Sequence, residues 1–131
     1  LNSPEINITS QEAIQCHGYA IQTRVTSEDP SNNFMPDTGK VSVYHSGSGN
    51  GIRLDGGNIY TGAEILPYYD SLLGKLIVYA GTREEALRKM KAALCELVVE
   101  GIETNIAEQL DLVSRPDFMD GSYDLTFLEG E

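Results

Sequence analysis

The hydrophobic pattern of this sequence changes its period near residue 80, and this change limits the folds that the chain can adopt. Before that point, short segments alternate between two faces with a period of two residues, which is typical of β-strands. After it, apolar residues recur at steps of three and four, which is typical of one face of a helix. The sequence therefore predicts an α+β fold in which a mainly antiparallel β-sheet comes first and C-terminal helices pack on it.

The predicted strands are separated by residues that favour turns. They cover residues 19–26, 39–45, 52–54, 63–66 and 72–79. Residues 31–38 contain several Asn, Asp and Pro and are predicted to be a loop, and residues 55–58 are predicted to be a turn. The glycine-rich segment 46–51 is predicted to be the turn of a β-hairpin. Its composition also resembles a phosphate loop, but such a loop leads from a strand into a helix and carries a lysine.

The helical half begins with a capping box, in which Thr82 precedes Glu85 by three residues. The apolar face of this helix is predicted from Leu87, Met90, Leu94, Leu97 and Val98. Gly101 is predicted to end the helix, because glycine adopts the left-handed conformation of a helix C-terminus readily. A shorter helix is predicted from Thr104 to about residue 113, and a last strand at 122–128.

Charge and composition exclude several classes of function. The formal net charge is −11, with 9 Lys and Arg against 20 Asp and Glu, so binding to nucleic acid is not expected. No apolar run approaches the roughly 18–20 residues of a membrane span. Cys16 and Cys95 do not form a disulfide pattern; Cys95 is predicted to act as a small apolar residue of the helix core, and we expect a reducing, cytoplasmic location. The chain begins with Leu1 and not with methionine, and we expect it to be part of a longer protein.

Few side chains have the spacing of a catalytic or metal-binding site. His17 and His45 are the only histidines, and neither has a Cys or Asp at ligand spacing, so no metal site is predicted. The carboxylate pair at 28–29 precedes a proline turn, and the pair at 84–85 lies in the first turn of a helix, where negative charge is favourable. Both pairs therefore have a structural explanation.

Arg53 is the one candidate that the alternation itself distinguishes. It lies between Ile52 and Leu54 in a short strand, so its side chain points to the opposite face. The structural interpretation is an exposed arginine that pairs with Asp55. A functional role is the alternative.

Six segments, in their order along the chain, resemble the C-terminal domain of biotin carboxylases. They are residues 18–30, 34–40, 51–55, 67–76, 101–106 and 123–128. The resemblance extends over almost the whole chain from Gly18, and we expect residues 1–131 to be one such domain.

This resemblance implies an enzyme, an ATP-dependent ligase that carboxylates biotin with bicarbonate through a carboxyphosphate intermediate. The biotin is held on a biotin carboxyl carrier domain, and an ATP-grasp region upstream of the present chain binds ATP and Mg or Mn. Further expected partners are a carboxyltransferase component and other copies of the protein in a homo-oligomer. The chain alone is expected to be inactive.

The arginine of the family's Gly-x-Arg strand corresponds to Arg53. The resemblance implies that Arg53 binds the ureido oxygen of biotin and acts in catalysis by stabilising the negative charge that develops there. Arginine suits this role because it stays protonated and presents a rigid set of donors.

The carboxyl acceptor is less sharply defined by the sequence. Residues 37–39, 47–49 and 53–55 resemble pyruvate carboxylase, which we favour, whereas 74–77 and 100–102 resemble the acetyl-CoA or propionyl-CoA carboxylases. Two other classes are weighed against the family: a non-catalytic assembly module, and a hydrolase that uses Asp70 or Glu28.

Overall fold

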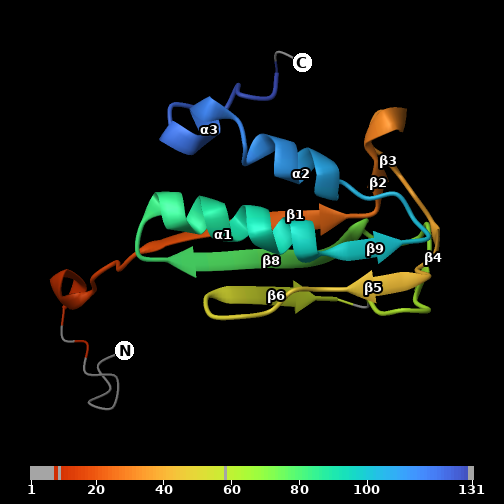
Figure 1. The fold of residues 1–131 in the computed structure, drawn as a ribbon, viewed down its shortest axis with the longest axis horizontal. Helices are drawn as coiled ribbons and strands as arrows, with labels where there is room; N and C mark the ends of the chain where they lie inside the picture. Colours follow the sequence, from red (N-terminus) through yellow and green to blue (C-terminus); the bar gives the residue numbers. More distant parts are fainter. Residues whose placement is uncertain (1–7, 9, 58, 130–131) are drawn as a thin grey trace.

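The centre of the molecule is a three-stranded antiparallel sheet. The computed structural model describes residues 8, 10–57 and 59–129. In the central sheet, β8 (Leu72–Ala80) lies between β1 (Tyr19–Thr26) and β6 (Ile52–Gly56), as Figure 1 shows. The strands predicted at 19–26, 52–54 and 72–79 are thus confirmed.

The remaining strands form three small two-stranded sheets. The pairs are β2 (Glu28–Asp29) with β3 (Met35–Pro36), β4 (Gly39–Lys40) with β7 (Glu64–Ile65), and β5 (Val43–His45) with β9 (Val98–Glu100). The 3₁₀-helices are η1 (Gln11–Ala13) and η2 (Pro30–Asn32). The segment predicted to be a single strand at 39–45 is two strands in two different sheets, and the loop predicted at 31–38 contains β3 and most of η2.

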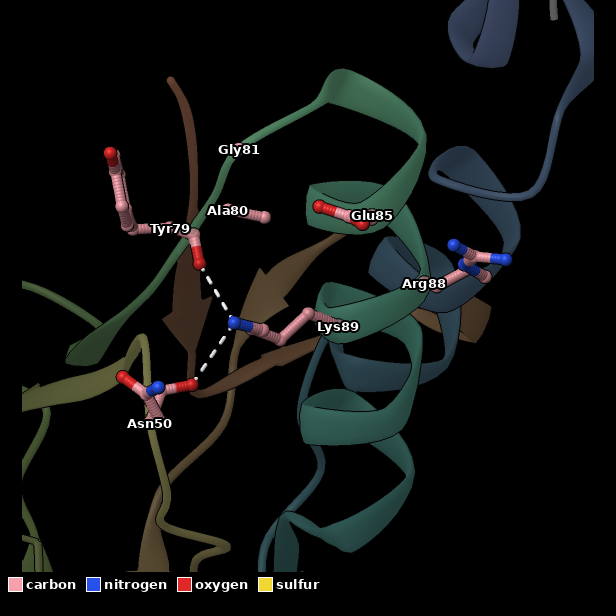
Figure 2. A pocket seen from close by; sticks show the side chains of 7 residues that line it. All are labelled: Asn50, Tyr79, Ala80, Gly81, Glu85, Arg88 and Lys89. Carbon is pink, nitrogen blue, oxygen red and sulfur yellow. Dashed lines mark hydrogen bonds between the residues drawn. The ribbon is translucent and has the colours of Figure 1, made fainter. Parts of the chain in front are cut away.

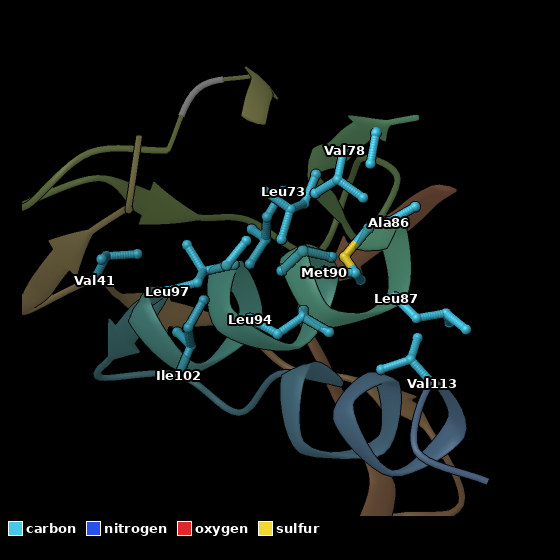
Figure 3. Close-up of a cluster of buried hydrophobic side chains, with 14 of the residues drawn as sticks. Val41, Leu73, Val78, Ala86, Leu87, Met90, Leu94, Leu97, Ile102 and Val113 are labelled. Carbon is cyan, nitrogen blue, oxygen red and sulfur yellow. The ribbon is translucent and has the colours of Figure 1, made fainter. Parts of the chain in front are cut away.

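Helix α1 (Arg83–Glu96) covers one face of the central sheet, which we call the inner face (Figure 1). The predicted cap is confirmed, because the Thr82 hydroxyl accepts a hydrogen bond from the Glu85 N–H at 3.2 Å. Figure 3 shows the buried side chains between helix and sheet. They include Leu73, Val78, Ala86, Leu87, Met90, Leu94 and Leu97. Each large apolar side chain that leaves water here contributes about 1.5–3 kcal/mol to stability.

Two short helices complete the fold. Helix α2 (Ile106–Leu112) contacts both α1 and β1, and α3 (Pro116–Asp120) follows it. The predicted short helix is confirmed, although it begins after Asn105 and not after Thr104. The α+β class, with a mainly antiparallel sheet and helices packed on it, is confirmed.

The glycine-rich segment 46–51 is not the turn of a hairpin. It joins β5 to β6, but β5 pairs with β9 and β6 pairs with β8. The two strands that it connects belong to different sheets, so it is a crossing between sheets. No helix follows it, which agrees with the rejection of a phosphate loop. Asn58 of the next predicted turn lies outside the described residues.

Two further predictions about the helical half are wrong. Gly101 does not end α1, since the helix ends at Glu96 and β9 comes before Gly101. Gly101 has a φ of 97°, and a side chain there would collide with the backbone at Lys40. The glycine therefore permits close packing of two segments, and Val98, assigned to the helix face, is an exposed strand residue.

The predicted strand at 122–128 is also wrong. In its place, an aromatic cluster holds the C-terminal segment: the Phe118 and Tyr123 rings stack with centroids 4.9 Å apart, and Phe127 contacts Tyr123. Aromatic contacts of this kind fix a segment without a ladder of backbone bonds.

The prediction that Cys95 belongs to the helix core is wrong, because Cys95 is exposed. Both Cys16 and Cys95 are free thiols.

Within the described residues, no helix has the length and the apolar character that crossing a membrane requires.

Candidate functional site

Arg53 lies on the face of the central sheet that α1 does not cover, which we call the outer face. Strand β6 alternates as expected: Ile52 and Leu54 pack against the core, and Arg53 points away from it. Its side chain is 73% exposed. The predicted orientation of Arg53 is therefore confirmed.

The predicted pairing of Arg53 with Asp55 is also confirmed. The Arg53 Nε–H donates to Asp55 Oδ1 at 2.6 Å. This hydrogen bond, together with the negative charge of Asp55, raises the pKa of Arg53 above its ordinary value. The guanidinium consequently stays protonated under all ordinary conditions. Because the bond uses Nε, the terminal nitrogens Nη1 and Nη2 can serve an external acceptor, and they have no acceptor among the described residues.

The backbone next to Arg53 is held against β8. Gly51 has a φ of 72°, and a side chain at this position would collide with the carbonyl oxygen of Tyr79. The Tyr79 N–H donates to Gly51 O at 2.8 Å. Only glycine allows this close approach without strain. The turn therefore fixes the start of β6 and, with it, the position of Arg53.

A hollow of about 560 Å³ lies beside this turn, between β8 and α1 (Figure 2). Lys89 of α1 crosses it, and its Nζ donates to the carbonyl oxygens of Asn50 at 3.0 Å and of Tyr79 at 2.9 Å. Two of its three donors are thus used to tie the helix to the turn. No local sequence pattern distinguishes Lys89, because its partners lie ten and 39 residues away along the chain.

A second hollow, of about 320 Å³, lies between β1 and the C-terminal segment. It has a mostly apolar lining that includes Ile21, Leu112, Phe118 and Phe127. Neither hollow contains Arg53.

The two carboxylates considered for a hydrolase form structural hydrogen bonds. Asp70 Oδ1 accepts from the Leu72 N–H at 3.0 Å, and Glu28 Oε1 accepts from the Ser71 hydroxyl at 2.6 Å. These bonds lie at the end of the loop that carries Tyr68 and Tyr69, both of which are exposed. Among the described residues, no group of three or more His, Cys, Asp or Glu could hold a metal ion.

Comparison with known proteins identifies the family. The family model of the biotin carboxylase C-terminal domain matches residues 22–130. The chain belongs to this family. The resemblance noted from the six sequence segments is therefore confirmed, with a match that extends over nearly the whole chain.

Curated relatives and solved structures agree with the family. The chain is 50% identical to pyruvate carboxylase of Bacillus subtilis over 129 residues, which is 98% of the chain and 11% of that protein. It is 49% identical to pyruvate carboxylase of Aspergillus terreus over 120 residues, 92% of the chain and 10% of that protein. Relatives of this size are about ten times longer than the match, so the chain corresponds to one part of them.

Two solved structures show the same fold. Pyruvate carboxylase of Rhizobium etli, with the allosteric activator acetyl coenzyme A, superimposes with a TM-score of 0.93 at 42% identity; the match covers 99% of this chain and 13% of that one. The biotin carboxylase domain of 2-oxoglutarate carboxylase from Hydrogenobacter thermophilus, a dimer in complex with MgADP, ADP and bicarbonate, gives 0.88 at 39% identity, with 92% of this chain and 26% of that one covered.

Proposed function

We propose that this chain is the C-terminal domain of the biotin carboxylase part of a pyruvate carboxylase. In this role it completes a site for ATP- and bicarbonate-dependent carboxylation of biotin on a carrier domain. The observation that carries the proposal is the 50% identity to a pyruvate carboxylase over 98% of the chain. Both relatives compared above by sequence identity are pyruvate carboxylases. This favours pyruvate over an acyl-CoA as the carboxyl acceptor.

Arg53 is the catalytic residue that we assign to this chain. Biotin supplies a ureido nitrogen that accepts the carboxyl group, and its ureido oxygen carries negative charge once that nitrogen has lost its proton. Arg53 would donate hydrogen bonds to this oxygen through Nη1 and Nη2 while Asp55 holds Nε. Donors that are in place before charge develops lower the barrier, since they need no reorganisation during the reaction.

Arg53 suits the ureido oxygen of biotin, and no cluster among the described residues suits a metal ion. Arg53 offers exposed, unused donors for an oxygen acceptor, whereas the described residues contain no cluster suited to a metal. We therefore assign ATP and Mg or Mn to the upstream ATP-grasp region. We also propose that the complete protein is a cytoplasmic homo-oligomer that contains the carrier domain and the carboxyltransferase component.

The test is bicarbonate- and biotin-dependent ATP hydrolysis by the complete carboxylase that contains this chain. Arg53→Ala should lower kcat on the order of 100- to 1,000-fold, by analogy with the loss of one donor to a developing oxyanion. Arg53→Lys should recover little, because an ammonium lacks the rigid arrangement of donors.

Lys40→Ala is the matched control, since Lys40 is an exposed cation on another sheet. Its activity should equal that of the unmodified protein. Full activity of Arg53→Ala would remove Arg53 from the mechanism, and a well-folded complete protein without biotin-dependent activity would refute the proposed function. The 131-residue chain alone should be inactive.

A further inference from the structure

The outer face of the central sheet carries three cations and one carboxylate, Asp55. Arg24 on β1, Lys75 on β8 and Arg53 on β6 all lie on it, and these are three of the nine cations in a chain of net charge −11. The inner positions of the same strands, such as Thr23 and Leu76, are buried. The sheet therefore separates a buried face from one on which Arg24 and Arg53 are exposed and Lys75 is half-buried.

Arg24 and Lys75 lie directly opposite each other across β1 and β8. Residues in such a pair point to the same face, with Cβ atoms about 4.5–5.5 Å apart, and like charges in this arrangement destabilise the sheet. Neither side chain takes part in the ion pairs of the described residues, which are Arg53–Asp55, Arg88–Glu84 and Arg115–Asp111.

Asp55 does not neutralise this pair. It lies opposite Lys75 on the other side, but its Oδ1 binds the Nε–H of Arg53, and Lys75 has no carboxylate oxygen within 4.0 Å in the described part of the chain. The two cations therefore have a repulsive neighbour and no acidic partner in the residues described. An arrangement of this kind becomes favourable when carboxylates from another surface cover it.

The shape of the outer face favours a protein surface over a small anion. Neither of the two hollows described above includes Arg24 or Lys75, so a small anion would sit on an open sheet in contact with water. Next to the cations, the face presents half-buried Ile77 and the Tyr79 ring, which is 49% exposed. Apolar side chains beside charged ones are typical of a protein–protein contact.

We propose that the outer face docks against an acidic surface of the same carboxylase polypeptide, outside residues 1–131, and that Arg24 and Lys75 each pair with a carboxylate there. The inference rests on the proposed function only in that the chain acts as part of a longer carboxylase. Arg53 lies one row further along the sheet, opposite Ile77. Docking therefore places Arg53 at the seam between the two parts, where water is excluded and its donors act more strongly.

The first experiment identifies the partner of Lys75 directly. A water-soluble carbodiimide joins an ammonium to a carboxylate only when the two are in contact, and it is applied to the complete carboxylase before digestion and mass spectrometry. The expected product links Lys75 to an Asp or Glu of the same polypeptide outside residues 1–131. Lys40, which is exposed and lies on another sheet, is the internal control and should give no such product.

Three outcomes overturn the inference. A mixture of ¹⁴N- and ¹⁵N-labelled copies shows whether the linked peptides come from one polypeptide; a link between labels would mean that a second copy covers the face. Acetylation of Lys75 at the same rate as Lys40 would mean that the face is uncovered. Protection of Lys75 by millimolar bicarbonate or phosphate, without any cross-link, would mean that a small anion binds there.

Charge reversal then tests the energetic role. Lys75→Glu and Arg24→Glu should each lower biotin-dependent ATP cleavage by the complete enzyme at least tenfold, and reversing the cross-linked carboxylate to lysine should restore part of the activity of Lys75→Glu. Lys40→Glu should have no effect. Unchanged activity in both reversals would refute the inference.

The two proposals fail in different ways. An active carboxylase in which Lys75 is uncovered would contradict the docking surface and leave the proposed function in place. A cross-link in a protein without biotin-dependent activity would support the docking surface and contradict the proposed function.

Discussion

Asn105 connects the start of α2 to the end of β1, and its replacement by alanine should lower the free energy of unfolding by about 2–4 kcal/mol. The residue is 8% exposed. Its Oδ1 accepts from the Thr26 N–H at 2.9 Å, and its Nδ2 donates to Arg24 O at 3.0 Å. The register of β1 with β8 shifts between Val25 and Thr26, so the amide supplies partners at a place where the ladder is irregular.

The magnitude follows from the two backbone groups that the substitution leaves without a partner. A buried donor or acceptor that loses its partner costs about 1–3 kcal/mol. For the Thr26 N–H and the Arg24 carbonyl together the cost is about 2–6 kcal/mol. Water can reach part of this region once the side chain is shortened, so the expected loss lies in the lower half of that range. Asn105→Asp should lie between the unmodified chain and Asn105→Ala, because it keeps the acceptor for Thr26 and loses the donor to Arg24.

Urea unfolding of the 131-residue chain, followed by circular dichroism, measures the effect. Asn50→Ala is the control, since Asn50 is exposed and its side chain makes none of the hydrogen bonds of the described residues; it should change stability by less than about 0.5 kcal/mol. A loss below about 0.5 kcal/mol for Asn105→Ala, with an unchanged urea dependence, would show that water replaces the amide and would refute the reasoning.

Three further predictions concern the turn at Gly51, the helix cap at Thr82 and the contact between Arg53 and Asp55. Gly51→Ala should destabilise the chain by at least about 1–2 kcal/mol in thermal unfolding, because alanine resists the positive φ and its side chain meets the Tyr79 carbonyl; an unchanged midpoint would contradict this. Thr82→Ala should cost about 1 kcal/mol in urea unfolding, whereas Thr82→Ser, which keeps the hydroxyl, should cost little. Asp55→Ala in the complete carboxylase should lower kcat roughly 10- to 100-fold and change the KM for ATP little, because Arg53 loses the bond that orients it. Partial recovery in Asp55→Glu is expected, and equal activity of all three proteins would show that Asp55 has no positioning role.

Elements with strong local signals can be predicted from the amino-acid sequence. The eight residues of β1 alternate long enough to define two faces, and the Thr82 cap and the apolar steps after it define α1. The orientation of Arg53 and its pairing with Asp55 also follow from the sequence, since residues two apart on a strand share a face. The family is also recognisable from the sequence, because its characteristic segments occur here in the family's order along the chain.

Strand pairing and side-chain burial depend on contacts between distant segments, and local patterns do not predict them. The two- and three-residue strands are too short to show a period. The partners of β5 and β6 lie elsewhere in the sequence, so the hairpin that the turn residues between them predict is wrong. Cys95 lies on α1 but outside its buried stripe, a distinction that depends on what packs against the helix. The opposition of Arg24 and Lys75 depends in the same way on the register of β1 and β8, because backbone pairing between segments about fifty residues apart leaves no trace in either segment alone.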